Sequence, residues 1–167
     1  MVLTKSELIA TLQNEVRVLQ HLITKIDPSM LAYRPTPKQR STLELLQYLT
    51  IMGPQLIMAA KKGSFDIEGW GAAVKEANAR DFAQTTAALA AQRDVYASLL
   101  GDMTDADFRT EVEMFTGKTS RGQFIVNMVI GGHAAYRTQL FLYLKSCGRE
   151  ELGTSNLWGG MDPQPRN

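Results

Sequence analysis

The chain contains a single cysteine, Cys147, among its 167 residues. One cysteine excludes the intramolecular disulfide framework on which many small secreted domains depend. The first residues, MVLTKSELIA, include no long apolar run of the signal-peptide kind. We therefore expect a protein of the reducing cytoplasm whose fold is held by packing alone.

Long apolar runs and an excess of charge are also lacking. No stretch approaches the roughly 18 uninterrupted apolar residues that are typical of a membrane-spanning helix. The 18 basic and 17 acidic residues nearly cancel, so the sequence has no strong electrostatic footprint for nucleic acid. We expect neither a membrane nor a nucleic acid as a partner.

Motifs of several common chemistries are missing as well. The sequence has no Gly-rich phosphate loop, no Ser-His-Asp order and no Cys-x-x-Cys pair. Alternating apolar residues are scarce, and only residues 110–115 form a weak strand candidate. These absences favour an all-α fold.

Four amphipathic segments are present, and each begins with a capping signal. A side chain that can cap a helix stands three residues before an acid or an amide. The four pairs are Thr4/Glu7, Ser41/Glu44, Asp81/Gln84 and Ser120/Gln123. Apolar spacing then predicts helices at about 4–26, 42–62, 82–100 and 120–147, followed by a tail at 148–167.

The connections between these helices are long. Residues 63–80 leave room for a short helix, and residues 101–119 contain a turn that Thr104 can cap. Long crossovers suit a four-helix bundle that is not a simple up-down design. We expect residues 1–167 to form one domain of this kind with an extended C-terminal tail.

The fourth predicted helix places His133 and Arg137 on its apolar face. At about 100° per residue, His133 lies at the middle of a narrow apolar arc, and Arg137 lies one turn further along it. The arc consists of Val126, Val129, Leu140 and Leu144. An ionised side chain there costs several kcal/mol unless a carboxylate, an anion or water pairs with it. The pattern therefore predicts a polar contact inside the bundle.

Three segments carry a resemblance to a known family: LAYRPTPKQRSTLELLQYL, the DADF turn, and GGHAAYRTQLFLYLKSCG. Over most of its length the chain resembles the DinB-like (DinB/YfiT-like) four-helix-bundle proteins. The resemblance implies a bundle in which three histidines, one from the second helix and two from the fourth, hold zinc or nickel. It also implies a family that includes metal-dependent transferases and isomerases using a low-molecular-weight thiol, and in which homodimers are frequent.

When the family's three metal ligands are matched to this sequence residue by residue, most of the metal site is missing. The second-helix ligand falls at Tyr48, and the fourth-helix ligands fall at His133 and Arg137. A guanidinium stays protonated and has no lone pair to offer a metal. If the alignment slips by one residue, Gln47 or Tyr136 takes these places, and neither is a good zinc ligand.

The resemblance therefore predicts the fold more firmly than the metal. We expect no cofactor and no metal ligand other than His133. Zinc or nickel held by His133 with a carboxylate, from Glu15 or Glu44, remains the alternative. The other histidine, His21, falls opposite the apolar stripe of its helix and is expected to face solvent.

Arg137 can be explained in two ways. A buried ion pair with Glu44 or Glu15 would fill the vacated metal position. Alternatively, its planar fork would recognise a carboxylate or phosphate ligand, with Tyr48 and His133 supplying neutral hydrogen bonds.

Two side chains outside the family motifs also bear on the interior and the tail. The helical wheel directs Arg93 inward, as a second charge near the site, unless its long side chain reaches out to water. Trp158, in the tail, is expected to be anchored across the open end of the bundle near the second helix, or against a second copy of the chain.

These observations predict a DinB-like bundle of unassigned activity with a degenerate three-histidine site. Its expected role is metal-free binding of a small anion, or a structural role, around a pocket of Tyr48, His133, Arg137 and Glu44. The alternative is a divalent-metal-dependent transferase that uses a low-molecular-weight thiol. The sequence does not decide whether the chain is an enzyme, and the resemblance favours a homodimer.

Overall fold

The computed structural model describes residues 3–115 and 117–164. Three long helices begin directly after their predicted capping residues: α1 (Lys5–Ile23), α2 (Thr42–Lys62) and α4 (Phe82–Gly101). At each of these starts, the capping side chain accepts a hydrogen bond from the backbone N–H of the residue three positions on. The acid or amide side chain of that residue accepts in turn from the backbone N–H of the capping residue, which completes a capping box. Ser120 caps the fourth helix by accepting from the N–H of Gln123. The local signals in the sequence thus set where the long helices start.

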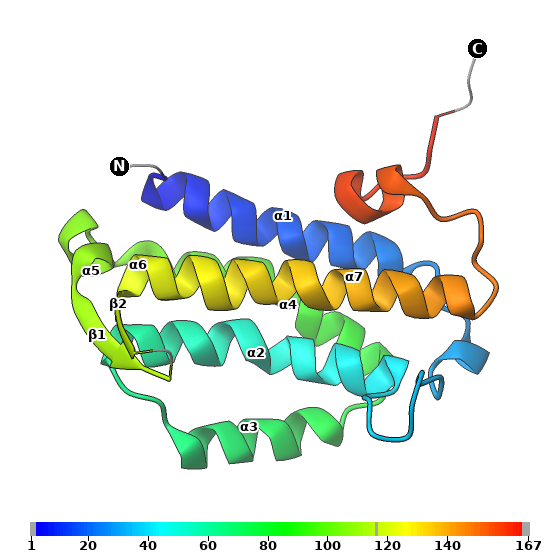
Figure 1. Ribbon diagram of the computed structural model, residues 1–167, viewed down its shortest axis with the longest axis horizontal. Helices are drawn as coiled ribbons and strands as arrows, with labels where there is room; N and C mark the ends of the chain where they lie inside the picture. The colour runs from blue at the N-terminus through cyan, green and yellow to red at the C-terminus, as the bar shows by residue number, and fades with distance from the viewer. Residues whose placement is uncertain (1–2, 116, 165–167) are drawn as a thin grey trace.

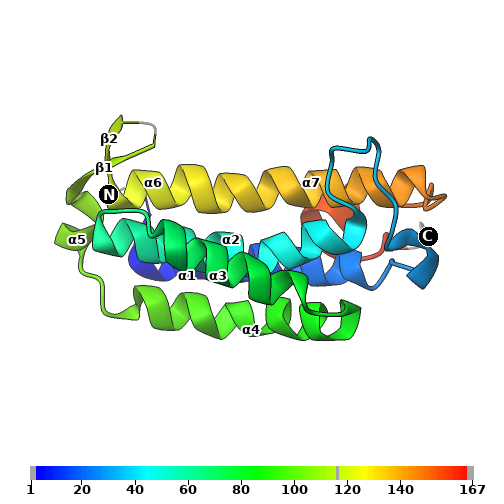
Figure 2. The same cartoon turned by 90° about the horizontal axis from the view of Figure 1, so that it is seen from below.

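The four long helices form a bundle around the apolar core. Both α1 and α2 pack against α4 and against α7 (Gly131–Ser146). Figure 2 shows α4 and α7 on opposite sides of α1 and α2. The largest fully buried side chains include Tyr96, Phe124, Leu12, Leu45 and Met52. The predicted all-α four-helix bundle is confirmed.

Short elements fill the long connections. The 310 turn η1 (Pro28–Met30) follows α1, and α3 (Ile67–Asn78) packs on the outer face of α2 (Figure 1). The short helix α5 (Asp105–Arg109) is capped by Thr104, as the sequence predicts. The weak strand candidate is real: β1 (Glu111–Met114) pairs antiparallel with β2 (Gly117–Ser120).

Pro54 lies inside α2, where it cannot donate to the carbonyl one turn earlier. The freed carbonyl belongs to Thr50, and the buried Gln92 side chain donates to it at 2.9 Å and to the carbonyl of Leu49 at 2.8 Å. A side chain from α4 therefore replaces the hydrogen bond that the proline removes. This contact ties α4 to the middle of α2.

The predicted fourth helix is not uniform. It runs through α6 (Arg121–Phe124), a π-helical segment η2 (Ile125–Ile130) and then α7. A π turn holds about one residue more than an α turn, so side chains before it are rotated relative to a regular wheel. Val126, which the wheel places in the buried arc, is 37% exposed, whereas Ile125 is fully buried.

The tail lies along α1 and α7, not near α2 as expected, and includes the turn η3 (Ser155–Gly159) (Figure 1). Arg17 donates to the carbonyl oxygens of Gly159 and Gly160 at 3.0 and 3.2 Å, and Lys25 pairs with Asp162 at 2.7 Å. Among the described residues, no helix has both the length and the apolar character needed to cross a bilayer.

Candidate functional site

The residues predicted to share one pocket lie in two separate places. His133 and Arg137 are closed inside the bundle, with exposed fractions of 2% and 4%. Tyr48 and Glu44 line an open pocket between α2, α3 and the loop at residues 31–41. The interior pair and the open pocket are therefore two separate sites.

Arg137 forms a buried ion pair with α1. Its Nη1 lies 2.5 Å from Oε2 of Glu15, and Glu15 is itself only 9% exposed. Of the two carboxylates that the sequence offers, the partner is therefore Glu15. Trp158 of the tail lies beside the pair, with its ring centroid 5.4 Å from Cζ of Arg137, but the residue is 65% exposed, so the ring is not buried as expected of an anchored tryptophan. The buried ion pair is one of the two explanations that the sequence offers for Arg137. The other, recognition of an anionic ligand, is not supported, because the guanidinium is already engaged with Glu15.

Glu44 is engaged elsewhere. Its carboxylate accepts from the backbone N–H of Ser41 at 2.7 Å and lies 3.1 Å from Nη2 of Arg34. The hydrogen bond from Ser41, together with Arg34, lowers the pKa of Glu44 although partial burial opposes the shift. Glu44 therefore carries a full negative charge at neutral pH at the edge of the open pocket.

His133 is held by Tyr96 of α4. The Tyr96 hydroxyl lies 2.6 Å from Nε2 of His133, and the two rings meet edge to face. Burial, assisted by the positive charge of Arg137, lowers the pKa of His133 to about 4. Burial also raises the pKa of Tyr96, so the pair is a neutral imidazole bonded to a neutral phenol.

Gly53 makes room for this pair. A Cβ atom at position 53 would overlap the Tyr96 hydroxyl oxygen. Position 53 therefore has room only for glycine, because the Tyr96 phenol of α4 lies against the α2 backbone there. A packing requirement of the His133 site thus accounts for the glycine at position 53 of α2.

Two other side chains were expected to bear on the interior or the surface, His21 and Arg93. His21 does not face solvent: its side chain is 14% exposed, and its Nε2 lies 3.0 Å from the Asn156 amide nitrogen and 3.7 Å from the Asp162 carboxylate of the tail. Desolvation lowers the pKa of His21. The positive charges of Lys25 and Arg17 lower it further, whereas the negative charge of Asp162 opposes the shift. Arg93 is exposed, in agreement with the alternative that its long side chain reaches out to water.

The structure shows which residue of the fourth helix faces Tyr48. The Tyr48 ring meets the Tyr136 ring edge to face, with centroids 5.1 Å apart, whereas Arg137 turns toward α1. Tyr136, not Arg137, therefore lies opposite the second-helix position of the family motif. Gly132, four residues earlier, would direct a Cβ to within 3.1 Å of the Met52 thioether.

These residues do not fit a three-histidine metal centre. Burial and the neighbouring Tyr136 phenol raise the pKa of Tyr48 to about 12, although the Arg40 guanidinium acts in the opposite direction. A neutral phenol, a glycine and a thioether are poor partners for zinc. Over residues 3–115 and 117–164, no three His, Cys, Asp or Glu side chains gather in a way that could hold a metal ion.

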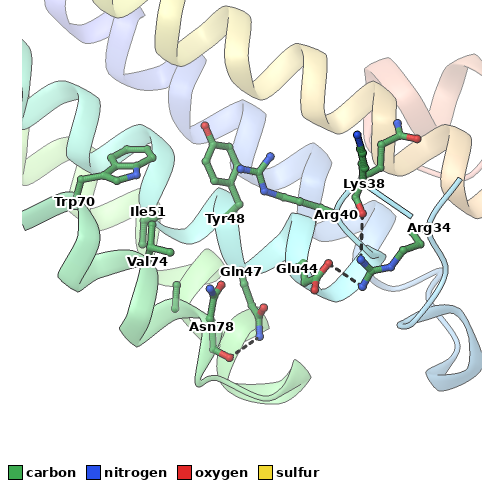
Figure 3. A pocket seen from close by; sticks show the side chains of 12 residues that line it. Arg34, Lys38, Arg40, Glu44, Gln47, Tyr48, Ile51, Trp70, Val74 and Asn78 are labelled. Atoms are coloured by element: carbon green, nitrogen blue, oxygen red, sulfur yellow. Dashed lines mark hydrogen bonds and ion pairs between the residues drawn. The ribbon is translucent and has the colours of Figure 1, made fainter. Parts of the chain in front are cut away.

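The open pocket has a volume of about 480 Å³ (Figure 3). Its lining comes from the loop, from α2 and from α3, and consists of Arg34, Lys38, Gln39, Arg40, Glu44, Gln47, Tyr48, Ile51, Trp70, Val74, Ala77 and Asn78. The loop is fixed at both ends. The Tyr143 hydroxyl donates to the carbonyl of Arg40 at 3.0 Å, and the N–H of Thr42 donates to the carbonyl of Tyr33 at 2.9 Å.

Positive charge is in excess at this pocket. The loop contributes Arg34, Lys38 and Arg40, and Glu44 is the one carboxylate among the described residues that line the pocket. Arg40 lies over the Tyr48 ring, with Cζ 3.9 Å from the centroid. In the part of the chain that the structure describes, neither Lys38 nor Arg40 has a carboxylate oxygen within 4.0 Å. The arrangement suits recognition of an anion.

The cations and the tryptophan of this pocket are not among the site residues predicted from the sequence. Lys38 and Arg40 stand in the segment RPTPKQR, just before the Ser41 cap, and this cluster of basic residues was the available signal. Trp70 comes from α3, in a connection for which the sequence gives only room for a short helix. Of the predicted pocket residues, the structure brings Tyr48 and Glu44 to this place and leaves His133 and Arg137 in the core.

The fold is that of a DinB-like four-helix bundle. The chain is similar to a solved structure of a DinB-like protein, YjoA, from Bacillus subtilis, with a TM-score of 0.66 and 16% sequence identity. The match covers 87% of this chain and 95% of the other. No family model and no curated protein matches the sequence. The fold that the resemblance implies is confirmed, and an activity does not follow from a likeness at this identity.

Proposed function

We propose that this protein binds a small anionic molecule in the open pocket, and that it does so without a metal. The observation that carries the proposal is the pair of cations Lys38 and Arg40, which face the pocket without a carboxylate partner among the described residues. Guanidinium and ammonium groups are the usual protein ligands for carboxylate and phosphate groups. Arg34 adds a third positive charge, which Glu44 partly offsets.

The pocket is organised before a ligand arrives. The hydrogen bonds of Tyr143 and Thr42 hold the loop in place, and the Tyr48 ring holds the Arg40 guanidinium. A binding site whose side chains are already in position loses less conformational entropy when it binds. These contacts therefore favour a preorganised binding site over a chance cluster of surface charges.

The proposal is tested by titrating benzoate and inorganic phosphate into the protein by calorimetry. We expect Arg40→Gln to weaken binding by about tenfold or more, because a charge-assisted hydrogen bond is lost. Affinity should also fall as salt screens the exposed cations. The matched control is Arg93→Gln, which removes the same charge from the exposed face of α4 and should leave affinity unchanged. Equal binding by both variants would reject this pocket.

The absence of a resident metal is tested by elemental analysis of protein purified without chelator or histidine tag. We expect zinc and nickel far below one per chain and no saturable uptake on titration, because Tyr48, Gly132 and Tyr136 supply no good ligand. The competing outcome is near-stoichiometric metal that is lost in His133→Gln. That result would direct the search to thiol-dependent transferase assays.

A further inference from the structure

We propose that the ligand of the open pocket is an amphipathic anion, with an apolar body and a single anionic head group. This inference rests on the proposed function and adds the chemical class of the ligand. It arises from the way in which apolar and cationic side chains are separated within the pocket.

The pocket has two chemically different ends. In Figure 3, Trp70, Ile51 and Val74 gather at one end, where α3 packs on α2. Arg34 and Lys38 lie at the other end, on the loop. A ligand that spans the pocket therefore meets apolar side chains at one end and positive charge at the other.

Burial follows the same division. Ile51 is 6% exposed and Ala77 is 1% exposed, and Trp70 is half-buried. The cations Lys38 and Arg40 are exposed. The apolar end of the pocket is thus less exposed than the cationic end, so the body of the ligand would lie against buried side chains and its head would stay near water.

Arg40 and Tyr48 join the two ends. The Arg40 guanidinium lies over the Tyr48 ring, with Cζ 3.9 Å from the ring centroid, and a guanidinium placed over a ring still has N–H groups to donate to an anion. The Tyr48 ring in turn meets Trp70 edge to face, with centroids 6.1 Å apart. A head group that accepts from Arg40 would therefore place its attached carbon skeleton beside Tyr48 and Trp70.

Glu44 limits how much negative charge the head can carry. Its carboxylate is ionised and fixed at the cationic end by Ser41 and Arg34. A polyphosphate would bring several negative charges close to this carboxylate, and like charges repel. A carboxylate or another compact head with one charge avoids that repulsion.

The experiment is a calorimetric series of acetate, butanoate, hexanoate and octanoate, with phosphate and pyrophosphate for comparison. The head group is constant in the first four, so the series reports the apolar body alone. We expect affinity to rise about fourfold for each added methylene until the apolar end of the pocket is filled. Pyrophosphate should bind no better than acetate.

Two variants test which end of the pocket binds the apolar body of the ligand and which end binds its head group. Trp70→Ala should weaken octanoate binding at least tenfold and leave acetate binding unchanged, whereas Arg40→Gln should weaken both. Trp70→Leu, which keeps an apolar side chain on α3, guards against a folding defect and should retain most of the octanoate affinity. Arg93→Gln again serves as the control.

The possible failures are distinguishable. Affinity that depends on Arg40 but not on chain length would overturn the amphipathic ligand and leave the anion site standing. Octanoate binding that neither Trp70→Ala nor Arg40→Gln weakens would place the ligand elsewhere and overturn the inference. If no anion of either set binds, the proposed function fails as well.

Discussion

Replacing Arg137 with methionine is expected to destabilise the fold by about 3–5 kcal/mol, because it leaves the carboxylate of Glu15 buried without a partner. Glu15 is 9% exposed and Arg137 is 4% exposed, so water cannot readily take the place of either charge. Urea unfolding followed by circular dichroism measures the loss as a lower midpoint with an unchanged slope.

The double variant Glu15→Leu/Arg137→Met tests the reason for this effect. Both charges are removed and the space is filled with apolar atoms, so most of the lost stability should return. Arg149→Met is the matched single control, since the Arg149 side chain is 29% exposed and pairs with Asp27 and Glu151 at 3.9 and 3.2 Å. It should cost at most about 1 kcal/mol. A cost this small for Arg137→Met would contradict a tightly paired interior.

Acidification is expected to destabilise the protein through His133. The folded-state pKa is about 4, against an ordinary value of 6.5. Below pH 6.5 the unfolded chain binds a proton that the folded chain does not, so stability falls as the pH drops. The loss is complete only below pH 4 and amounts to about 3 kcal/mol from this residue.

The measurement is the free energy of unfolding of the wild type and of His133→Gln at pH 7 and at pH 4.5. Carboxylates with lowered pKa, such as Glu44 and Asp162, lose their contribution in acid in both proteins and cancel in the difference. The variant should therefore show the smaller acid loss, by about 2–3 kcal/mol. His21→Gln is the control, because partly exposed His21 should contribute less. Parallel pH profiles for the wild type and His133→Gln would refute the buried neutral imidazole.

The long helices were predictable because their signals are local. A capping box involves side chains only three residues apart, and Leu12, Val16 and Leu19 of α1 form a stripe that a wheel can read. α3 was harder because its apolar residues, among them Trp70 and Val74, stand among glycines and cover only the outside of α2. Val126 was misplaced because a wheel assumes constant rotation, which the π turn breaks.

The candidate site was less predictable because its contacts join distant parts of the chain. Helical periodicity marks Arg137 as buried, but its choice between Glu15 and Glu44 depends on how α1 and α7 pack. His21 is on the outer face of α1, as the wheel predicts, but the tail returns to cover it. The cationic loop takes its shape from the Tyr143 hydroxyl, which the sequence places about a hundred residues away.

The π-helical turn of η2 adds about one residue between the cap of the fourth helix and the residues that lie beyond the turn. A regular α-helix would reach from Ser120 to Tyr136 with about one residue fewer. In a relative without the turn, the residue that occupies the same place in space would thus stand one position nearer to the helix cap. When two sequences align with a one-residue offset along such a helix, the offset can therefore come from one residue inserted in a π turn. The side chains beyond the turn would then keep the same neighbours in space.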